Sequence, residues 1–176
     1  MLIPTLVVVV SVIALLIVVI LLKSNDFRVS RSLKMRATPG QAFAHVNDLH
    51  LMNAWNPWLK LDPNLKQTYE GAASGVGAIY SWDGDKNVGA GRQTIVETRP
   101  PEFVRTKLEF FRPFCGVNEV LFTFVPEGNQ TVVTWNMSGK LNFFTKVMGL
   151  FVSMDKMCGD SFEKGLADFK VILESQ

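Results

Sequence analysis

Two charged residues, Arg31 and Asp155, fall in stretches that otherwise read as apolar, and such positions can hold the polar part of a ligand. Arg31 is in phase with the apolar residues that alternate from Phe27 to Met35. Asp155 lies about 20° from the centre of an apolar stripe along the last helical segment. An isolated buried charge costs several kcal/mol, so a buried charge is usually paired or bound to a ligand.

Two interpretations of these charges remain open. In the first, Arg31 and Asp155 lie inside a cavity, where they pair or orient the head group of an amphiphile. In the second, Arg31 lies beyond the covered part of the sheet, or the helix breaks near Ser153 and Asp155 caps its second half.

The spacing of the histidines and of the glycine-rich segments does not suit a metal site or a nucleotide site. His45 and His50 are five residues apart, which does not place both on one helical face, and no acidic or cysteine partner has metal-ligand spacing. The glycine-rich segments 75–77 and 89–91 do not open a helix after a strand, as a dinucleotide site requires. We therefore predict no metal, no cofactor and no catalytic residue, with Asp155 as the one candidate general acid or base.

The first segment of the chain reads as a membrane anchor. Residues Leu2 to Leu22 carry no charge and make a helix of about 31 Å, against a hydrocarbon core of roughly 30 Å. No basic residue precedes the run, and no small-residue cleavage site follows it. Residues 23–36 hold five basic residues and one acidic residue, which predicts a cytoplasmic side. We predict a single-pass membrane protein with an uncleaved transmembrane anchor at 1–23 and one domain at 24–176 facing the cytoplasm.

Charge and cysteine content exclude several classes of function. Residues 37–176 hold 13 basic and 15 acidic side chains, a balance that does not suit binding to phosphates, so nucleic acid is not an expected partner. Cys115 and Cys158 are far apart and form no CxxC motif, which argues against a zinc or redox site.

The order of elements predicts an α+β fold. An alternating strand over 27–37 precedes a short helix opened by Thr38-Pro39 and a second short helix over 49–55. Six β-rich runs separated by turn residues follow, near 66–71, 76–83, 90–98, 102–111, 116–125 and 130–138.

The segment after the last strand predicts one long helix with a single apolar stripe. The stripe consists of Phe144, Met148, Phe151, Cys158, Phe162, Leu166, Phe169 and Leu173. Gly159 and Gly165 flank it, although each glycine costs a helix about 1 kcal/mol relative to alanine. Either the glycines leave room for a bound molecule, or they allow the helix to pack closely on the sheet.

This sequence resembles the START-like, or helix-grip, superfamily, and within it the bacterial polyketide cyclase/dehydrase and lipid-transport-like (SRPBCC) proteins. The resemblance covers about residues 27–174 and rests on the order of five segments: 37–39, 55–58, 75–77, 131–135 and 159–166. It implies a curled antiparallel sheet of about seven strands around the long carboxy-terminal helix, with two short helices after the first strand. It also implies a deep apolar cavity and no shared catalytic residues.

The predicted cavity combines both charges with aromatic residues of the strands and residues of the closing helix, although ordinary core packing also explains the aromatic set. Its expected lining is Arg31, Tyr80, Trp82, Phe110, Phe122, Trp135, Asp155, Cys158, Phe162 and Gly165. We predict a membrane-anchored binding module for a lipid or other hydrophobic small molecule. The alternatives are a cyclase/dehydrase-type enzyme acting on a polyketide-like substrate and a domain that docks a protein partner, whose identity the sequence leaves open.

Overall fold

The computed structural model describes every residue except 1, 23, 142, 150–152 and 176, and it leaves out the side chains of residues 2, 3, 8, 9, 12, 13, 16, 22, 143, 144 and 148. The helices are α1 (Leu2–Leu22), α2 (Pro39–Asn47), α3 (Leu49–Asn53), the 3-10 helix η1 (Pro57–Leu61), α4 (Phe143–Met148) and α5 (Met154–Glu174). The strands are β1 (Asp26–Met35), β2 (Lys66–Gly71), β3 (Ala78–Asp83), β4 (Ala90–Arg99), β5 (Phe103–Arg112), β6 (Gly116–Glu127) and β7 (Gln130–Lys140).

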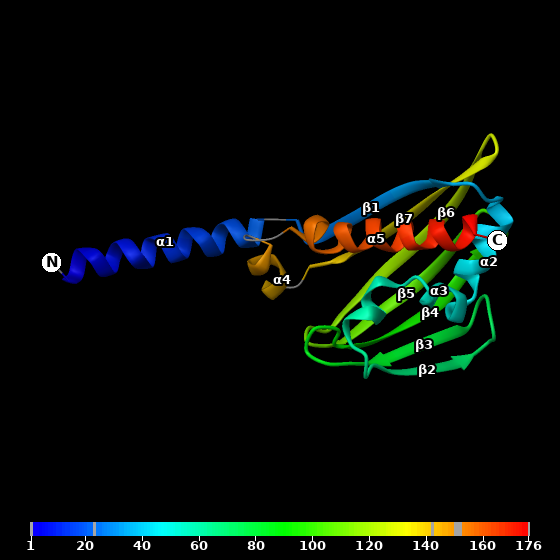
Figure 1. The fold of residues 1–176 in the computed structure, drawn as a ribbon. Helices are drawn as coiled ribbons and strands as arrows, with labels where there is room; N and C mark the ends of the chain where they lie inside the picture. Colours follow the sequence, from blue (N-terminus) through cyan, green and yellow to red (C-terminus); the bar gives the residue numbers. More distant parts are fainter. Residues whose placement is uncertain (1, 23, 142, 150–152, 176) are drawn as a thin grey trace.

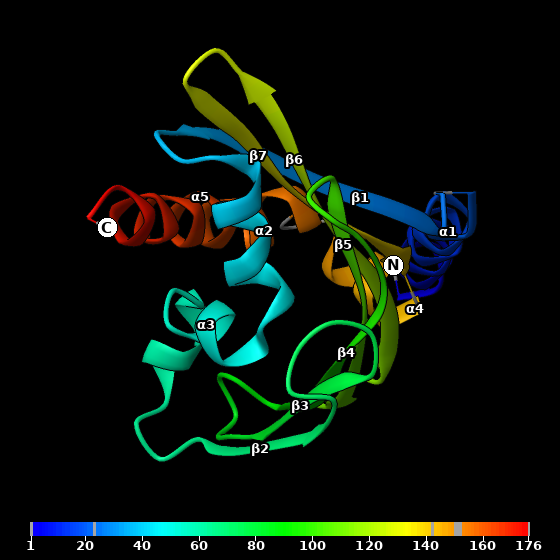
Figure 2. The ribbon, with the colours of Figure 1, turned by 90° about the vertical axis from the view of Figure 1, so that its right-hand side faces the viewer.

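The seven strands form one antiparallel sheet in the order β1-β7-β6-β5-β4-β3-β2. Consecutive strands from β2 to β7 are neighbours, as the short turns between the β-rich runs predict, and β1 adds to the edge beside β7. The sheet curls, and α2, α3 and α5 cover its inner face (Figure 2). This is the predicted α+β helix-grip arrangement.

Local sequence signals begin the short helices where they are expected. Thr38 is the N-cap of α2, and its hydroxyl accepts a hydrogen bond from the Gln41 amide in a complete capping box. Asp48 caps α3, and Asn56 caps η1 by accepting from the Trp58 amide. These two short helical segments bring Trp55 into the core, where it is fully buried.

The core fills the space between the curled sheet and α5. In β1 the predicted alternation is confirmed, because Val29 and Met35 are buried while Arg28 and Ser30 are exposed. From α5, four apolar side chains enter the core, namely Phe162, Leu166, Phe169 and Leu173. Trp55, which lies between α3 and η1, stacks on Phe169 of α5 at a centroid distance of 4.5 Å. This contact holds the segment that joins α3 to η1 directly onto α5.

The closing helix is shorter than predicted. The structure has α4 and α5 in place of one helix from 144 to 173, so the break near Ser153 that the second interpretation of the charges allowed is present. The cap of α5 is Ser153, which accepts from the Lys156 amide, and not Asp155. Periodicity alone could not show this break, because the apolar phase of the sequence continues across it. Of the predicted stripe, the part from Cys158 onward faces inward on α5, whereas the side chains of Phe144, Met148 and Phe151 lie outside the described residues.

The predicted membrane anchor is wrong. A bilayer crossing needs about 20 predominantly apolar residues in one helix. Within the described part of the chain, no helix has both the length and the apolar character that this requires. The prediction rested on the length of residues 2–22, on their lack of charge and on the basic residues that follow them. The predictions of a single-pass membrane protein and of a cytoplasmic orientation depended on this anchor, so they are wrong as well. In Figure 1, α1 extends away from the sheet.

Candidate functional site

A cavity of about 160 Å³ lies between the inner face of the sheet and the elements that cover it. Its walls come from α3, η1, α5 and five strands of the sheet, and most of them are apolar or aromatic. The lining residues are Met52, Asn56, Trp58, Leu59, Leu65, Tyr80, Trp82, Val88, Gln93, Leu108, Phe110, Val120, Trp135, Met137, Cys158 and Phe162. An apolar cavity of this kind is the usual form of a small-molecule site.

Six of the ten predicted lining residues are in the wall of this cavity: Tyr80, Trp82, Phe110, Trp135, Cys158 and Phe162. The other four, Arg31, Phe122, Asp155 and Gly165, are not. Phe122 is a core residue, fully buried, with its ring 5.9 Å from that of Trp55 and 5.0 Å from that of Trp135.

Sequence reasoning missed part of the wall that strand alternation could have identified. Leu108, Val120 and Met137 are each two residues from a predicted cavity or core residue on the same strand, so they share its face. Gln93 is a different case, because nothing in its local pattern distinguishes a buried glutamine from an exposed one. Its amide donates to the Thr106 hydroxyl at 3.2 Å, which satisfies one polar group inside the wall.

Two buried polar atoms on lining residues have no hydrogen-bond partner among the described residues: the Tyr80 hydroxyl and the Trp135 Nε1. Tyr80 is 2% exposed and Trp135 is 4% exposed. Burial raises the pKa of Tyr80, so its hydroxyl stays protonated over the physiological range. A buried polar group without a partner costs about 1–3 kcal/mol, which makes each of these atoms a place where a bound molecule would gain a hydrogen bond.

Gly165 allows α5 to pack closely and does not leave space in the cavity. A Cβ at this position would lie 2.9 Å from the Trp135 ring and 3.2 Å from Pro57 Cδ. The Trp135 ring is itself stacked on Phe162, with centroids 4.2 Å apart and planes 5° apart. Of the two interpretations of the glycines, the structure therefore supports close packing at Gly165.

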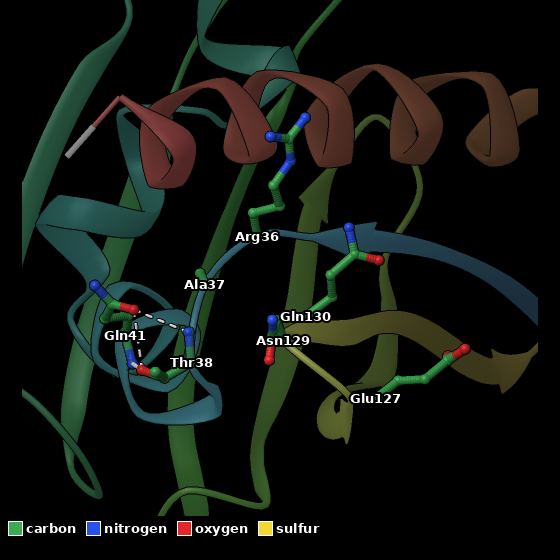
Figure 3. Close-up of a pocket in the computed structure, with 7 residues that line it drawn as sticks. All are labelled: Arg36, Ala37, Thr38, Gln41, Glu127, Asn129 and Gln130. Carbon is green, nitrogen blue, oxygen red and sulfur yellow. Dashed lines mark hydrogen bonds between the residues drawn. The ribbon is translucent and has the colours of Figure 1, made fainter.

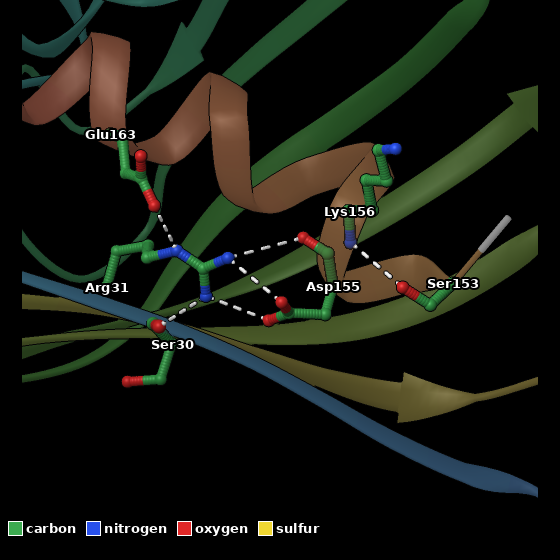
Figure 4. Close-up of polar contacts among 6 residues, drawn as sticks. All are labelled: Ser30, Arg31, Ser153, Asp155, Lys156 and Glu163. Atoms are coloured by element: carbon green, nitrogen blue, oxygen red, sulfur yellow. Dashed lines mark hydrogen bonds and ion pairs between the residues drawn. The ribbon is translucent and has the colours of Figure 1, made fainter.

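Arg31 and Asp155 pair with each other, but at the surface beside the cavity. The Arg31 guanidinium donates to both Asp155 carboxylate oxygens, at 2.8 and 2.9 Å, and to Glu163 Oε1 at 2.6 Å (Figure 4). It also donates to the Ser30 carbonyl oxygen at 2.9 Å. The side chain of Arg31 is 23% exposed and that of Asp155 is 58% exposed.

The same cluster explains Gly159. A Cβ on Gly159 would overlap the Arg31 guanidinium, so the absence of a side chain lets the guanidinium lie across the first turns of α5. Hydrogen bonds from Arg31 lower the pKa of Asp155, and hydrogen bonds to Asp155 and Glu163 raise the pKa of Arg31. We call Arg31, Asp155, Gly159 and Glu163 the Arg31 clamp.

Two further observations limit the chemistry of this region. Burial raises the pKa of the Cys158 thiol, so Cys158 contributes a small, neutral side chain to the cavity wall. Among the described residues, no group of three His, Cys, Asp or Glu side chains could hold a metal ion.

A second pocket, of about 540 Å³, is an open hollow beside the start of α2 and is lined by Arg36, Ala37, Thr38, Gln41, Glu127, Asn129 and Gln130 (Figure 3). The polar groups of Thr38 and Gln41 bond to each other in the capping box, and Glu127 pairs with Lys34 at 2.5 Å. This hollow therefore lacks the enclosed apolar wall of the cavity.

Comparison with known proteins agrees with this geometry. The family described as "Polyketide cyclase / dehydrase and lipid transport" matches residues 26–174. Among curated proteins, none matches this chain. Among solved structures, the Aha1 dimer from Colwellia psychrerythraea has a TM-score of 0.59 at 16% identity, over 84% of this chain and 96% of that one.

Two other solved structures share the same arrangement of strands and helices. The di-domain ARO/CYC StfQ from the steffimycin biosynthetic pathway has a TM-score of 0.61 at 13% identity, over 86% of this chain and 51% of that one. Ginseng major latex-like protein 151 from Panax ginseng has a TM-score of 0.55 at 16% identity, over 85% of this chain and 98% of that one. At these identities the likeness shows the fold alone.

Proposed function

This chain belongs to the polyketide cyclase / dehydrase and lipid transport family, in the START-like, helix-grip superfamily, and on that premise we propose that it binds a hydrophobic small molecule in the cavity under α5. The observation that carries the proposal is the cavity itself, whose wall is formed mainly by apolar and aromatic side chains. We take the domain within 24–176 as the binding unit.

The volume of the cavity limits what it holds in this conformation. Pockets for drug-sized ligands measure about 300–1,000 Å³, whereas an apolar cavity of about 150 Å³ in another protein takes up benzene. At about 160 Å³, the cavity suits a compact molecule of about one ring. A sterol or phospholipid would require the wall to move.

The wall also favours a neutral ligand. None of the described lining residues carries a carboxylate, an imidazole or an amine, so a charged ligand group would be buried without a counter-charge. The same composition supports binding better than acid–base chemistry. The family description and the likeness to StfQ, a protein of a biosynthetic pathway, keep cyclase-type activity as the second candidate, and turnover of a polyketide-like substrate would be the evidence for it.

The experiment is a calorimetric titration of the full chain with toluene. We expect saturable binding at one site. Val120 lines the cavity and is 3% exposed, so a larger side chain there should fill the cavity. Val120→Phe places a phenyl ring in a cavity that holds about one ring, and it should abolish toluene binding.

The matched control uses the same strand and the same substitution. Val125 lies on β6 and is 56% exposed, so Val125→Phe should leave toluene binding unchanged. Equal binding by the unmodified protein and the Val120→Phe variant would show that toluene occupies another place. Absence of binding to the unmodified, folded protein would favour the third possibility, a domain that docks a protein partner.

A further inference from the structure

The Arg31 clamp joins the cavity wall to the edge of the sheet. Arg31 lies opposite Trp135 in the β1–β7 register, so the two side chains are neighbours on the inner face. Trp135 stacks on Phe162, and both line the cavity. The start of α5 is thus fastened at two adjacent points, one polar and one aromatic.

The first turns of α5 have few other attachments. Among residues 154–161, all of which the structure describes, the only buried one is Gly159, while Met154 and Cys158 are half-buried. The second half of the helix is held by apolar core residues, of which Leu166 is 1% exposed and Phe169 is fully buried. The part of α5 that contributes Cys158 to the cavity therefore depends on the clamp more than the rest of the helix does.

We infer that the Arg31 clamp determines the size of ligand that the cavity admits, by holding the first two turns of α5 onto β1. This inference rests on the proposed binding function. With the clamp closed, the cavity suits about one ring; with the clamp open, the wall at Cys158 can move outward and admit a larger apolar molecule. Arg31 is in this respect a positioning residue, because it acts on the ligand through α5.

The test compares two apolar probes, toluene and pyrene, on the full chain. The unmodified protein should bind toluene and discriminate against pyrene. Arg31→Met removes the clamp and should raise the affinity for pyrene relative to toluene by at least about fivefold, the lower end of the range for coupled sites.

Gly159→Ala should also open the Arg31 clamp, by a different change. Its methyl group would occupy the place of the Arg31 guanidinium, while all three charges remain in the chain. Alanine also favours a helix over glycine, so this variant should stay folded. It should admit pyrene as Arg31→Met does.

The matched control is Lys34→Met. Lys34 lies on the same strand and pairs with Glu127, and it is exposed on the opposite side of β1. Like the unmodified protein, this variant should bind toluene and discriminate against pyrene. High salt screens exposed ion pairs, so salt should raise the relative pyrene affinity of the unmodified protein more than that of Arg31→Met.

The outcomes separate the inference from the binding function. If toluene binds but folded Arg31→Met and Gly159→Ala keep the original discrimination, the inference is overturned and the binding function stands. If the folded unmodified protein binds neither probe, both are overturned.

Discussion

Replacing Tyr80 by phenylalanine should stabilise the ligand-free protein, which is the reverse of the usual effect at a buried tyrosine. The Tyr80 hydroxyl is buried and has no hydrogen-bond partner among the described residues. An unsatisfied buried polar group costs about 1–3 kcal/mol, and removing one oxygen loses only a few dispersion contacts of about 0.1–0.2 kcal/mol each. Tyr80→Phe should therefore raise the free energy of unfolding by about 1–2 kcal/mol.

The second tyrosine of the chain is a matched control. Tyr69 lies beside Tyr80, with ring centroids 5.1 Å apart, but its hydroxyl accepts a hydrogen bond from Asn53 Nδ2 at 2.8 Å. Tyr69→Phe loses this bond, so the free energy of unfolding should fall by about 0.5–1.5 kcal/mol. The same substitution should thus have opposite signs at two adjacent positions.

Urea unfolding of the full chain, followed by tryptophan fluorescence and extrapolated to water, measures both changes. The slope with denaturant should not change, because neither substitution alters the surface exposed on unfolding. A loss of stability in Tyr80→Phe equal to that in Tyr69→Phe would refute the reasoning, since it would mean that the Tyr80 hydroxyl has a partner such as a cavity water.

Two further predictions concern α5. Gly165→Ala gains about 1 kcal/mol of helix propensity but forces a methyl group against Trp135 and Pro57, which costs about 1–3 kcal/mol, so urea unfolding should show a net loss of up to about 2 kcal/mol. A gain of stability would mean that both neighbours can move aside. The second prediction is that the folded protein loses stability in acid. Arg31 lowers the pKa of Asp155 in the folded state, so the ionised Asp155 stabilises the fold above pH 3.8, the ordinary pKa of an aspartate. This stabilisation is lost as the pH falls through the lowered pKa of Asp155. Unfolding measured against pH should show this acid loss in the unmodified protein and a smaller one in Arg31→Met; equal slopes in both would contradict the prediction.

Much of the fold could be predicted because its signals are local. The Thr38-Pro39 cap, the alternation along β1 and the turn residues between the strands each act within a few residues, and the structure has the corresponding elements at nearly the expected positions. The break before α5 is also a local signal, the cap at Ser153, but the apolar periodicity that continues across it favoured one long helix. The membrane anchor, predicted from the length and lack of charge of residues 2–22 and from their basic flank, is wrong, since no helix within the described residues is long and apolar enough to cross a bilayer.

The sequence by itself determined that consecutive strands from β2 to β7 are neighbours, which faces of β1 and α5 point inward, and which residue types can form an apolar cavity. The place of β1 beside β7 was not predicted. Only the tertiary structure decided which of those residues meet. Whether Gly165 leaves space or is filled depends on the Trp135 ring, which comes from a strand 30 residues earlier. Likewise, Arg31 and Asp155 are 124 residues apart, and the packing of α5 against β1 brings them together as an ion pair that is partly exposed and outside the cavity wall. Periodicity assigns a residue to a face of its own element, while contact between two faces depends on how the elements pack.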